Sequence, residues 1–414
     1  MRQVKSSSFE FLEPDQIDQA DVSDHLTAAL SPYNSGKSGR EGWTCAWAPD
    51  SSYFAWSSGY RILHLIPWDA NKKKRHDPAD TEGLKERKYH MIDCGELIWA
   101  LAFGSGLPQK ASHIYRHCSY DKNLVVATGL ASGRIKLFNC FTGSVIVELL
   151  DHRDTVRGLD FSKDGSLQLM SGSRDGTLKL WDLNNEGNMY CTHKARAKVN
   201  ACKFSMNGKF AAAVGTNKTV LLWHGPIKDS PFYRLEGHHN EVVGVDFSSD
   251  SVLMATASFD TRVIIWNAYR VQRLRELGHL HPSPSLIFAG GANDNFVRSV
   301  NFSRDGVNVA TVCDDGFVRF WHWEEDGDPV SVLQVSDPLC GQFSSDGTVL
   351  GVGTRSGDAQ FVCAPQPLPS LLQLSRVAVR KAMRSDSVDG LPLPYLLKHF
   401  LKYRDFLKDD SRLL

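Results

Sequence analysis

The chain has 414 residues, of which 42% are hydrophobic and 23% are charged, a composition typical of folded globular proteins. Its 47 Lys and Arg balance its 47 Asp and Glu, so no overall field attracts it to nucleic acid or to an anionic membrane. It lacks the apolar runs of a signal peptide or a membrane span, and its nine cysteines show no CxxC or Cys/His ligand spacing, which predicts an intracellular protein without disulfides or a metal site.

Residues 1–40 form a leader with one strand-like segment, SFEFLE at residues 8–13. Its apolar and polar side chains alternate as they do in an edge strand, so the segment could supply the outer strand that closes the last, seventh sheet of the fold. A disordered leader is the alternative. SGKSG at residues 35–39 has part of a phosphate-binding loop, but Ser31 stands where that loop requires glycine. We expect a flexible segment there and no nucleotide site.

One short motif recurs along the chain: an aromatic residue, a small residue, any residue, Asp or Asn, then Gly or Ser. We call each copy the head of a repeated unit. About twenty residues after most of these heads a second aromatic residue closes an alternating run. Because Asp-Gly turns separate the short apolar runs, each unit is predicted to be a set of antiparallel strands. The heads begin at Trp47, Phe161, Phe204, Phe247, Phe302 and Phe343, with Phe103 as a degenerate copy, and the closing aromatics are Trp68, Phe138, Trp181, Trp223, Trp266, Trp321 and Phe361.

Three gaps between units are longer than the rest and have the composition of surface loops. They cover residues 71–88, 104–121 and 281–295. The first contains KKKR at residues 72–75, which would suit a nuclear address or a phosphate contact. Acidic residues follow it at once, so we interpret it as a solvated loop.

Two units each contain a His, a Ser, an Asp and a Trp at matching positions. The first three are the residue types of a hydrolase catalytic triad. An active site needs one nucleophile, whereas this set is repeated. We therefore predict no catalytic residue, and interpret each set as a hydrogen-bond network that holds a turn and satisfies the indole N–H. The sets are His152, Ser173, Asp175 and Trp181, and then His238, Ser258, Asp260 and Trp266.

These repeats resemble the WD-repeat family, whose units of about 40 to 45 residues each build a four-stranded propeller blade. The heads at 161, 204 and 247 are 43 residues apart. The resemblance implies an all-β fold, a seven-bladed WD-repeat β-propeller over residues 41–364, and it implies that the repeated sets are the family's structural tetrads. Asn217 replaces the Asp in the fourth unit and the sixth shows no His at the matching position, so we expect those blades to be held less tightly.

After Pro369 the apolar period changes from two to 3.6 residues. Ser370 is a suitable N-cap for an amphipathic helix over residues 370–383. In a second segment, residues 388–404, the prolines of LPLP delay a helix until Tyr395. Two short helices cannot bury all of this apolar surface on each other, which indicates a partner. A tail packed against its own propeller is the alternative.

The tail, residues 365–414, resembles the SOCS box, a small α-helical adaptor that links a substrate-binding domain to a cullin ubiquitin ligase. The resemblance implies that the first helix binds elongin C, and with it elongin B, through Ser370, Leu371, Leu374, Ser375 and Val379. Ser375 stands where the family carries cysteine, which leaves the strength of that binding open. The second segment has the form associated with cullin-5, at Val388, Leu391, Pro392, Leu393, Pro394, Leu397, Phe400 and Leu401.

Together these features identify the chain as a member of the family of WD-repeat and SOCS-box-containing proteins. The family implies a non-catalytic substrate receptor: the propeller binds an unidentified protein, and the tail recruits elongin B/C, cullin-5 and a RING subunit. A propeller scaffold without a ligase role, or an enzyme with its site in the central channel, would be the alternatives. We expect no cofactor and no nucleic-acid or membrane partner, and a cytoplasmic location with the nucleus left open.

The substrate is expected at one end of the propeller, near the entries to the innermost strands. Charged and aromatic residues there suit protein recognition, although each could also be an ordinary solvated rim residue. The candidates are Arg157, Arg174, Phe259, Arg298 and Asp314.

Overall fold

The repeated heads form tight turns that stabilise themselves. In FSKDG, the Asp164 carboxylate accepts the Ser166 N–H at 2.9 Å, and Gly165 has a φ of +73°. That left-handed conformation is one that glycine adopts without strain. In FSRDG, the Ser303 hydroxyl also donates to the Asp305 carboxylate. The motif therefore reverses the chain between neighbouring strands by using its own side chains.

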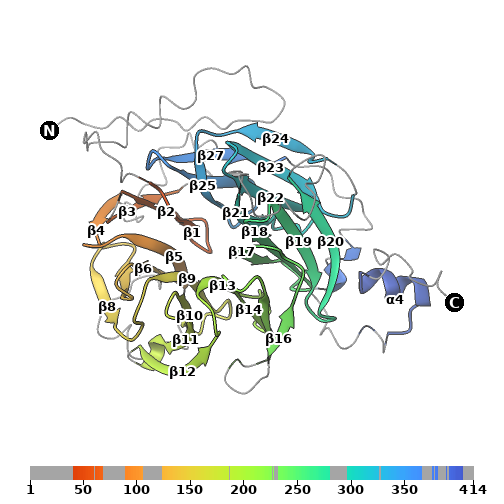
Figure 1. Ribbon diagram of the computed structural model, residues 1–414, viewed down its shortest axis with the longest axis horizontal. Helices are drawn as coiled ribbons and strands as arrows, with labels where there is room; N and C mark the ends of the chain where they lie inside the picture. The colour runs from red at the N-terminus through yellow and green to blue at the C-terminus, as the bar shows by residue number, and fades with distance from the viewer. Residues whose placement is uncertain are drawn as a thin grey trace, which may run out of the picture.

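The computed structural model describes residues 41–59, 61–68, 89–105, 124–185, 187–225, 227, 232–279, 296–325, 328–365, 375–376, 378–380, 388 and 391–403. Their strands form seven antiparallel sheets arranged in a ring around one axis (Figure 1), which confirms the predicted seven-bladed propeller. Six sheets have four strands, and the seventh has three among the described residues. The degenerate second unit is a full blade, with Phe103 in its inner strand.

We number the blades in chain order, each from its inner to its outer strand. Blade 1 has β1 (Cys45–Trp47), β2 (Tyr53–Ser58), β3 (Ile62–Pro67) and β4 (His90–Asp93); blade 2 has β5 (Ile98–Ser105), β6 (Leu124–Leu130), β7 (Ile135–Asn139) and β8 (Val145–Leu149). Blade 3 has β9 (Val156–Phe161), β10 (Gln168–Ser173), β11 (Thr177–Asp182) and β12 (Asn188–Lys194), with the short helix η2 (Leu183–Asn185) before β12. Blade 4 has β13 (Val199–Phe204), β14 (Phe210–Gly215), β15 (Val220–His224) and β16 (Phe232–Leu235); blade 5 has β17 (Val242–Phe247), β18 (Leu253–Ser258), β19 (Arg262–Asn267) and β20 (Gln272–Gly278). Blade 6 has β21 (Val297–Phe302), β22 (Asn308–Cys313), β23 (Phe317–His322) and β24 (Ser331–Gln334); blade 7 has β25 (Pro338–Phe343), β26 (Val349–Thr354) and β27 (Ala359–Cys363).

The core lies between neighbouring blades. Val125 and Leu137 of blade 2, for example, belong to one buried cluster with Leu159, Leu169 and Trp181 of blade 3. Sheets covered on both faces need apolar side chains in both directions, which explains why the middle strands are almost continuously apolar. The packing leaves the central channel and the rims of the ring available for binding.

Blades 1 and 7 close the ring. The Trp47 indole donates to the Gln342 carbonyl at 2.9 Å, and the Trp56 indole donates to the Gly357 carbonyl at 3.1 Å. The predicted closing strand at residues 8–13 lies outside the described residues, as do SGKSG at 35–39 and KKKR at 72–75.

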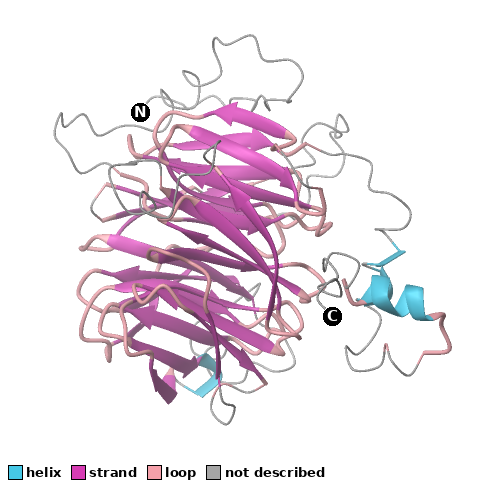
Figure 2. Ribbon diagram, turned by 45° about the vertical axis from the view of Figure 1, so that its right-hand side comes forward, coloured by secondary structure: helices cyan, strands magenta, loops and turns pink. Residues whose placement is uncertain are grey.

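The tail lies outside the ring, beside blades 5 and 6. Residues 375–376 and 378–380 are helical, and α4 (Tyr395–Leu401) begins directly after LPLP, as predicted. Figure 2 shows α4, in cyan, apart from the strands of the propeller. The Asn267 side chain of blade 5 donates to the Lys402 carbonyl at 3.4 Å, and further contacts between the tail and the blades are given below. On α4, the side chains of Tyr395 and Leu397 are exposed.

Candidate functional site

The inner strands of blades 2 to 7 each carry a β-bulge at their second residue. In blade 3, Val156 pairs with Ser173 and Gly158 pairs with Gly172, so Arg157 has no partner in the sheet. A bulge turns the extra side chain in a new direction, and bulges are common beside functional sites. The bulged residues are Trp99, Arg157, Asn200, Val243, Arg298 and Leu339.

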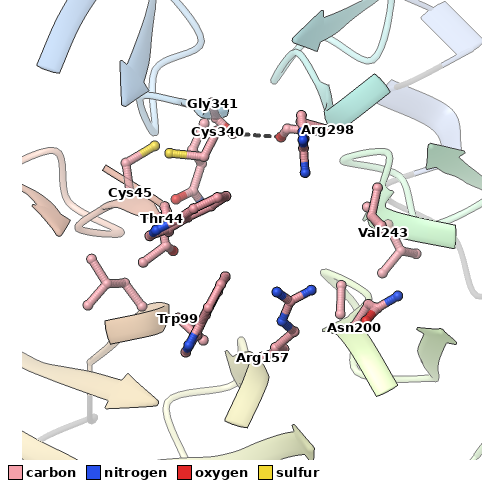
Figure 3. A pocket seen from close by; sticks show the side chains of 18 of the residues that line it. Thr44, Cys45, Trp99, Arg157, Asn200, Val243, Arg298, Cys340 and Gly341 are labelled. Atoms are coloured by element: carbon pink, nitrogen blue, oxygen red, sulfur yellow. Dashed lines mark hydrogen bonds between the residues drawn. The ribbon is translucent and has the colours of Figure 1, made fainter. Parts of the chain in front are cut away.

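These bulged residues line a cavity of about 220 Å³ on the axis of the ring, which we call the central pocket. Every blade contributes to its wall; blade 1 supplies Cys45, preceded by Trp43 and Thr44. In Figure 3 the Arg157 and Arg298 side chains point into the pocket from different blades, and Trp99 lies beside Arg157. The repeated bulge thus places a different side chain from each blade around one space.

Arg157 is held against an aromatic wall. Its guanidinium lies 4.2 Å from the centre of the Trp99 ring, and Trp43 packs on Trp99 with 5.0 Å between ring centroids. The Arg157 Nε is buried and has no acceptor in the described part of the chain. Burial, reinforced by the positive charges of Arg174 and Arg298, lowers the pKa of Arg157 to about 10. The side chain therefore remains charged at neutral pH while one of its N–H groups has no acceptor.

Arg298 differs from Arg157 because its charge is already paired. Its Nε and Nη2 donate to the Asp314 carboxylate at 2.6 to 2.9 Å. It also lies 5.1 Å from the centre of the Phe259 ring. Arg298 and Phe259 line the central pocket with Arg157. Arg174 is close enough to affect the Arg157 pKa, and its Nε is likewise buried without an acceptor among the described residues.

The structure therefore places the five predicted substrate residues in or next to one pocket, and it adds two tryptophans that sequence reasoning missed. Trp99 had a usable signal, because it follows Ile98 at the start of an inner strand as Arg157 follows Val156. Trp43 gave no such signal in the sequence, because it lies before β1 and not within an inner strand.

The hydrogen bonds of blades 3 and 5 correct the predicted tetrads. In blade 3 His152 joins Asp175 at 2.9 Å through Nδ1 and Ser171 at 2.7 Å through Nε2, and the Trp181 indole donates to Ser171 at 2.8 Å. In blade 5 the hydroxyl belongs to Thr256, between His238 and Trp266, with His238 also bonded to Asp260.

The predicted Ser173 and Ser258 have another role. Each hydroxyl accepts the N–H of the tetrad aspartate, at 3.0 Å for Asp175 and 3.1 Å for Asp260. The error of two residues arose because side chains two apart on a strand point to the same face, so spacing alone did not separate them. Burial opposes ionisation of Asp175, but hydrogen bonds from Thr177, the Arg153 N–H and His152 outweigh it and lower its pKa to about 2.

Blade 6 also corrects the sequence analysis, because it does contain the tetrad histidine. His279 bonds to Thr311 at 2.8 Å, and the Trp321 indole donates to the same hydroxyl at 2.9 Å. The aspartate at the matching position, Asp315, binds Arg319 instead. His279 is separated from the inner strand of blade 6 by the sixteen residues 280–295 and by Phe296. It therefore does not lie at the spacing from the strand that the other tetrad histidines have.

The network is absent from the described residues of blade 4. Ala213 stands at the position of the tetrad hydroxyl, and the buried Trp223 Nε1 has no acceptor among the described residues. Among the described residues, the side chain of Asn217 accepts one hydrogen bond, from the Thr219 N–H at 3.4 Å.

The SOCS-like tail is attached to blades 5 and 6 by a few specific contacts. The Tyr403 hydroxyl donates to Asp250 at 2.6 Å, and the Arg376 guanidinium donates to Glu324 at 2.7 Å. Arg376 is 2% exposed, and it lies 3.7 Å from the centre of the Phe400 ring and 4.5 Å from that of Tyr403. One arginine thus connects the two tail segments to the propeller.

The predicted partner-binding residues of the tail differ in exposure. Among those for elongin, Ser375 is exposed and Val379 is half-buried, whereas Ser370, Leu371 and Leu374 lie outside the described residues. Among those for cullin, Pro392, Pro394 and Leu397 are exposed; Leu391, Leu393 and Phe400 are half-buried; and Val388 and Leu401 are buried. The last two are internal supports of the segment in this chain.

Within the described ranges no helix is long and apolar enough to cross a bilayer. In the same ranges no group of three or more His, Cys, Asp or Glu could hold a metal ion. No disulfide joins any of the eight cysteines placed there.

Comparisons with known proteins match both parts of the chain. A family model described as "SOCS box" matches residues 368–402, and one described as "WD domain, G-beta repeat" matches residues 143–182, 187–224, 229–267 and 282–322. The "WD repeat and SOCS box-containing protein 1" of Homo sapiens is 44% identical over 402 residues, which cover 92% of this chain and 95% of the relative. Its namesake in Danio rerio is 42% identical over 417 residues, covering 94% of this chain and 97% of the relative. The chain therefore belongs to the family of WD repeat and SOCS box-containing proteins.

Proposed function

We propose that this chain is the substrate-recognition subunit of a cullin-RING ubiquitin ligase of the elongin B/C and cullin-5 type. The propeller holds the target protein, and the tail docks the ligase core, whose RING subunit brings the charged ubiquitin carrier. The chain itself performs no bond chemistry in this proposal. It acts by proximity, because holding the acceptor lysine near the thioester raises the effective concentration of that lysine.

The observation that supports the proposal is a SOCS-box match at the end of a WD-repeat propeller, in which the segment predicted to select the cullin has exposed apolar side chains. Leu397 is 43% exposed, and Pro392 and Pro394 are exposed on the segment that precedes it. Apolar side chains held in this way offer the kind of contact that forms the centre of a protein interface. The buried Val388 and Leu401 support that surface from within.

Co-purification of elongin C and cullin-5 with the full chain tests the proposal. Leu371→Asp is expected to abolish recovery of both partners. Leu397→Asp should reduce cullin-5 recovery by about tenfold or more and leave elongin C unchanged, because an aspartate in an apolar contact is desolvated without a partner. Val332→Asp is the matched control, since Val332 lies on the outer strand of blade 6 and is 46% exposed.

The rival interpretation is a WD-repeat scaffold without a ligase role. It would be favoured if the unmodified chain and the Leu371→Asp variant recovered equal amounts of elongin C.

A further inference from the structure

We propose that the central pocket binds a protein segment through one negatively charged side chain, with a phosphoryl group preferred to a carboxylate. The inference rests on the proposed function and names the class of substrate: a phosphorylated or acidic segment held by Arg157 and Arg174, with an apolar neighbour against Trp43 and Trp99.

The charges around the pocket leave a positive excess. Arg298 is neutralised by Asp314 through the bidentate contact described above. Neither Arg157 nor Arg174 has an ion pair with a carboxylate in the described part of the chain. Glu241 is the carboxylate whose charge acts on Arg157, and it opposes the stronger effects of burial and of Arg174. The Arg157 guanidinium therefore lies near a second guanidinium, that of Arg174, and it forms no ion pair with Glu241, the carboxylate whose charge acts on it.

Deeper charges do not change this balance. Lys203, which also lines the pocket, lies 3.7 Å from Asp160, and the charges of Asp160 and Asp246 both stabilise its charged form. Lys163 forms a further ion pair with Asp160 at 2.8 Å. These groups compensate one another, so the excess stays with Arg157 and Arg174.

The two arginines also have buried N–H groups that lack acceptors. The Nε of Arg157 and the Nε of Arg174 are both in this state. A buried donor without an acceptor destabilises the folded state, and more so when the group is charged. An anion with several oxygens would satisfy these donors, since guanidinium groups bind phosphate and carboxylate oxygens through paired N–H donors.

Arg157 is ordered before any ligand arrives. Its guanidinium is stacked on Trp99, which Trp43 supports in turn, and the β-bulge fixes its direction. Less side-chain entropy is lost on binding when a group is already in position. The exposed parts of Trp43 and Trp99 can then contact an apolar side chain next to the anion.

The size of the pocket favours a protein side chain as its occupant. At about 220 Å³ it is smaller than the roughly 300 to 1,000 Å³ of pockets for drug-sized ligands. Nucleic acid would need a track of cations along its backbone. The chain has equal numbers of acidic and basic residues, and the excess at the pocket is confined to two arginines.

Retention of the full-length chain on immobilised peptide pools tests the inference. Four pools of short peptides share randomised flanks and differ in a central phosphoserine, glutamate, serine or lysine. We expect about tenfold more retention on phosphoserine than on serine, with glutamate between them and lysine lowest. The Arg157→Gln/Arg174→Gln variant should retain no preference among the pools. Arg153→Gln, which alters an exposed arginine of blade 3, should behave as the unmodified chain.

Three results would overturn the inference: equal retention on all four pools, a preference for phosphoserine that persists in the double variant, or stronger retention on a single-stranded oligonucleotide than on phosphoserine. Recovery of elongin C by the same variants separates this failure from failure of the proposed function. Loss of peptide preference with elongin C still bound locates the defect in the pocket. Peptide preference without elongin C would leave the pocket proposal standing and refute the ligase role.

Discussion

At the scale of single residues, His279 makes the stability of blade 6 sensitive to acid. Its Nε2 bonds to Thr311, but its buried Nδ1 has no acceptor among the described residues, so a proton there would add an unpaired charge. Burial, and then the positive charge of Arg319, lower the pKa of His279 from 6.5 to about 3, against the smaller opposing effect of Asp315. The folded state therefore binds fewer protons than the unfolded state between those two values.

We predict that stability falls as the pH drops below 6.5, by about 1.4 kcal/mol per pH unit for this one group. In His279→Gln, whose amide can still donate to Thr311, the free energy of unfolding should fall less steeply between pH 6 and pH 4. Urea denaturation at several pH values measures both slopes. His239→Gln is the control because His239 is exposed. Parallel curves for His279→Gln and the unmodified chain would refute the prediction.

At the scale of the elements, blade 4 can be stabilised by restoring the hydroxyl that the other tetrads use. We predict that Ala213→Thr raises the free energy of unfolding by about 1 kcal/mol, because the Trp223 N–H gains an acceptor. The new hydroxyl can donate to the Leu221 carbonyl, as Thr256 donates to the Ile264 carbonyl at 3.4 Å. Thermal denaturation of the purified chain measures the change.

Two single substitutions, one in blade 4 and one in blade 5, provide the control for this prediction. Trp223→Phe removes an N–H that has no acceptor, whereas Trp266→Phe in blade 5 takes the donor away from Thr256. The first should therefore destabilise the protein less than the second. The opposite order, or a lower melting temperature for Ala213→Thr, would show that blade 4 has no room for the network.

The sequence was sufficient to predict the number of blades, because the head motif carries its own turn and recurs in register. It was also sufficient for the start of α4, which LPLP determines. It failed where the answer depended on contacts between distant segments. His279 could not be assigned to blade 6 across the inserted loop, and Ser171 could not be distinguished from Ser173 because both lie on one face of β10.

The pocket residues were predicted in part for the same reason. Arg157 and Arg298 were found because both follow the first residue of an inner strand, a position that is local in sequence. The pairing of Arg298 with Asp314, and the lack of such a partner for Arg157, depend on the whole blade. Charge balance at the pocket was therefore visible only in the folded structure.

At the scale of the whole molecule, the contacts of the tail determine how the SOCS box is held relative to the propeller. Asp250, which accepts from Tyr403, belongs to the FSSDS head of blade 5, where Ser248 donates to its other oxygen at 2.6 Å. The Tyr403 ring also packs on Trp323 of blade 6, with 5.6 Å between centroids. The tail is thus attached at the junction of two blades.

We predict that Tyr403→Phe loosens the tail without weakening the propeller. It leaves one oxygen of the buried Asp250 without its donor, at a cost of about 1 to 3 kcal/mol, while the tetrads and the packing between blades are untouched. Amide hydrogen exchange in α4 should become roughly 5 to 150 times faster, since local opening follows the same free energy. The melting temperature of the propeller should stay the same. Tyr395→Phe alters a side chain that is 69% exposed and should leave exchange unchanged. If α4 exchanged at one rate in all three proteins, the bond between Tyr403 and Asp250 would not be what holds the tail in place.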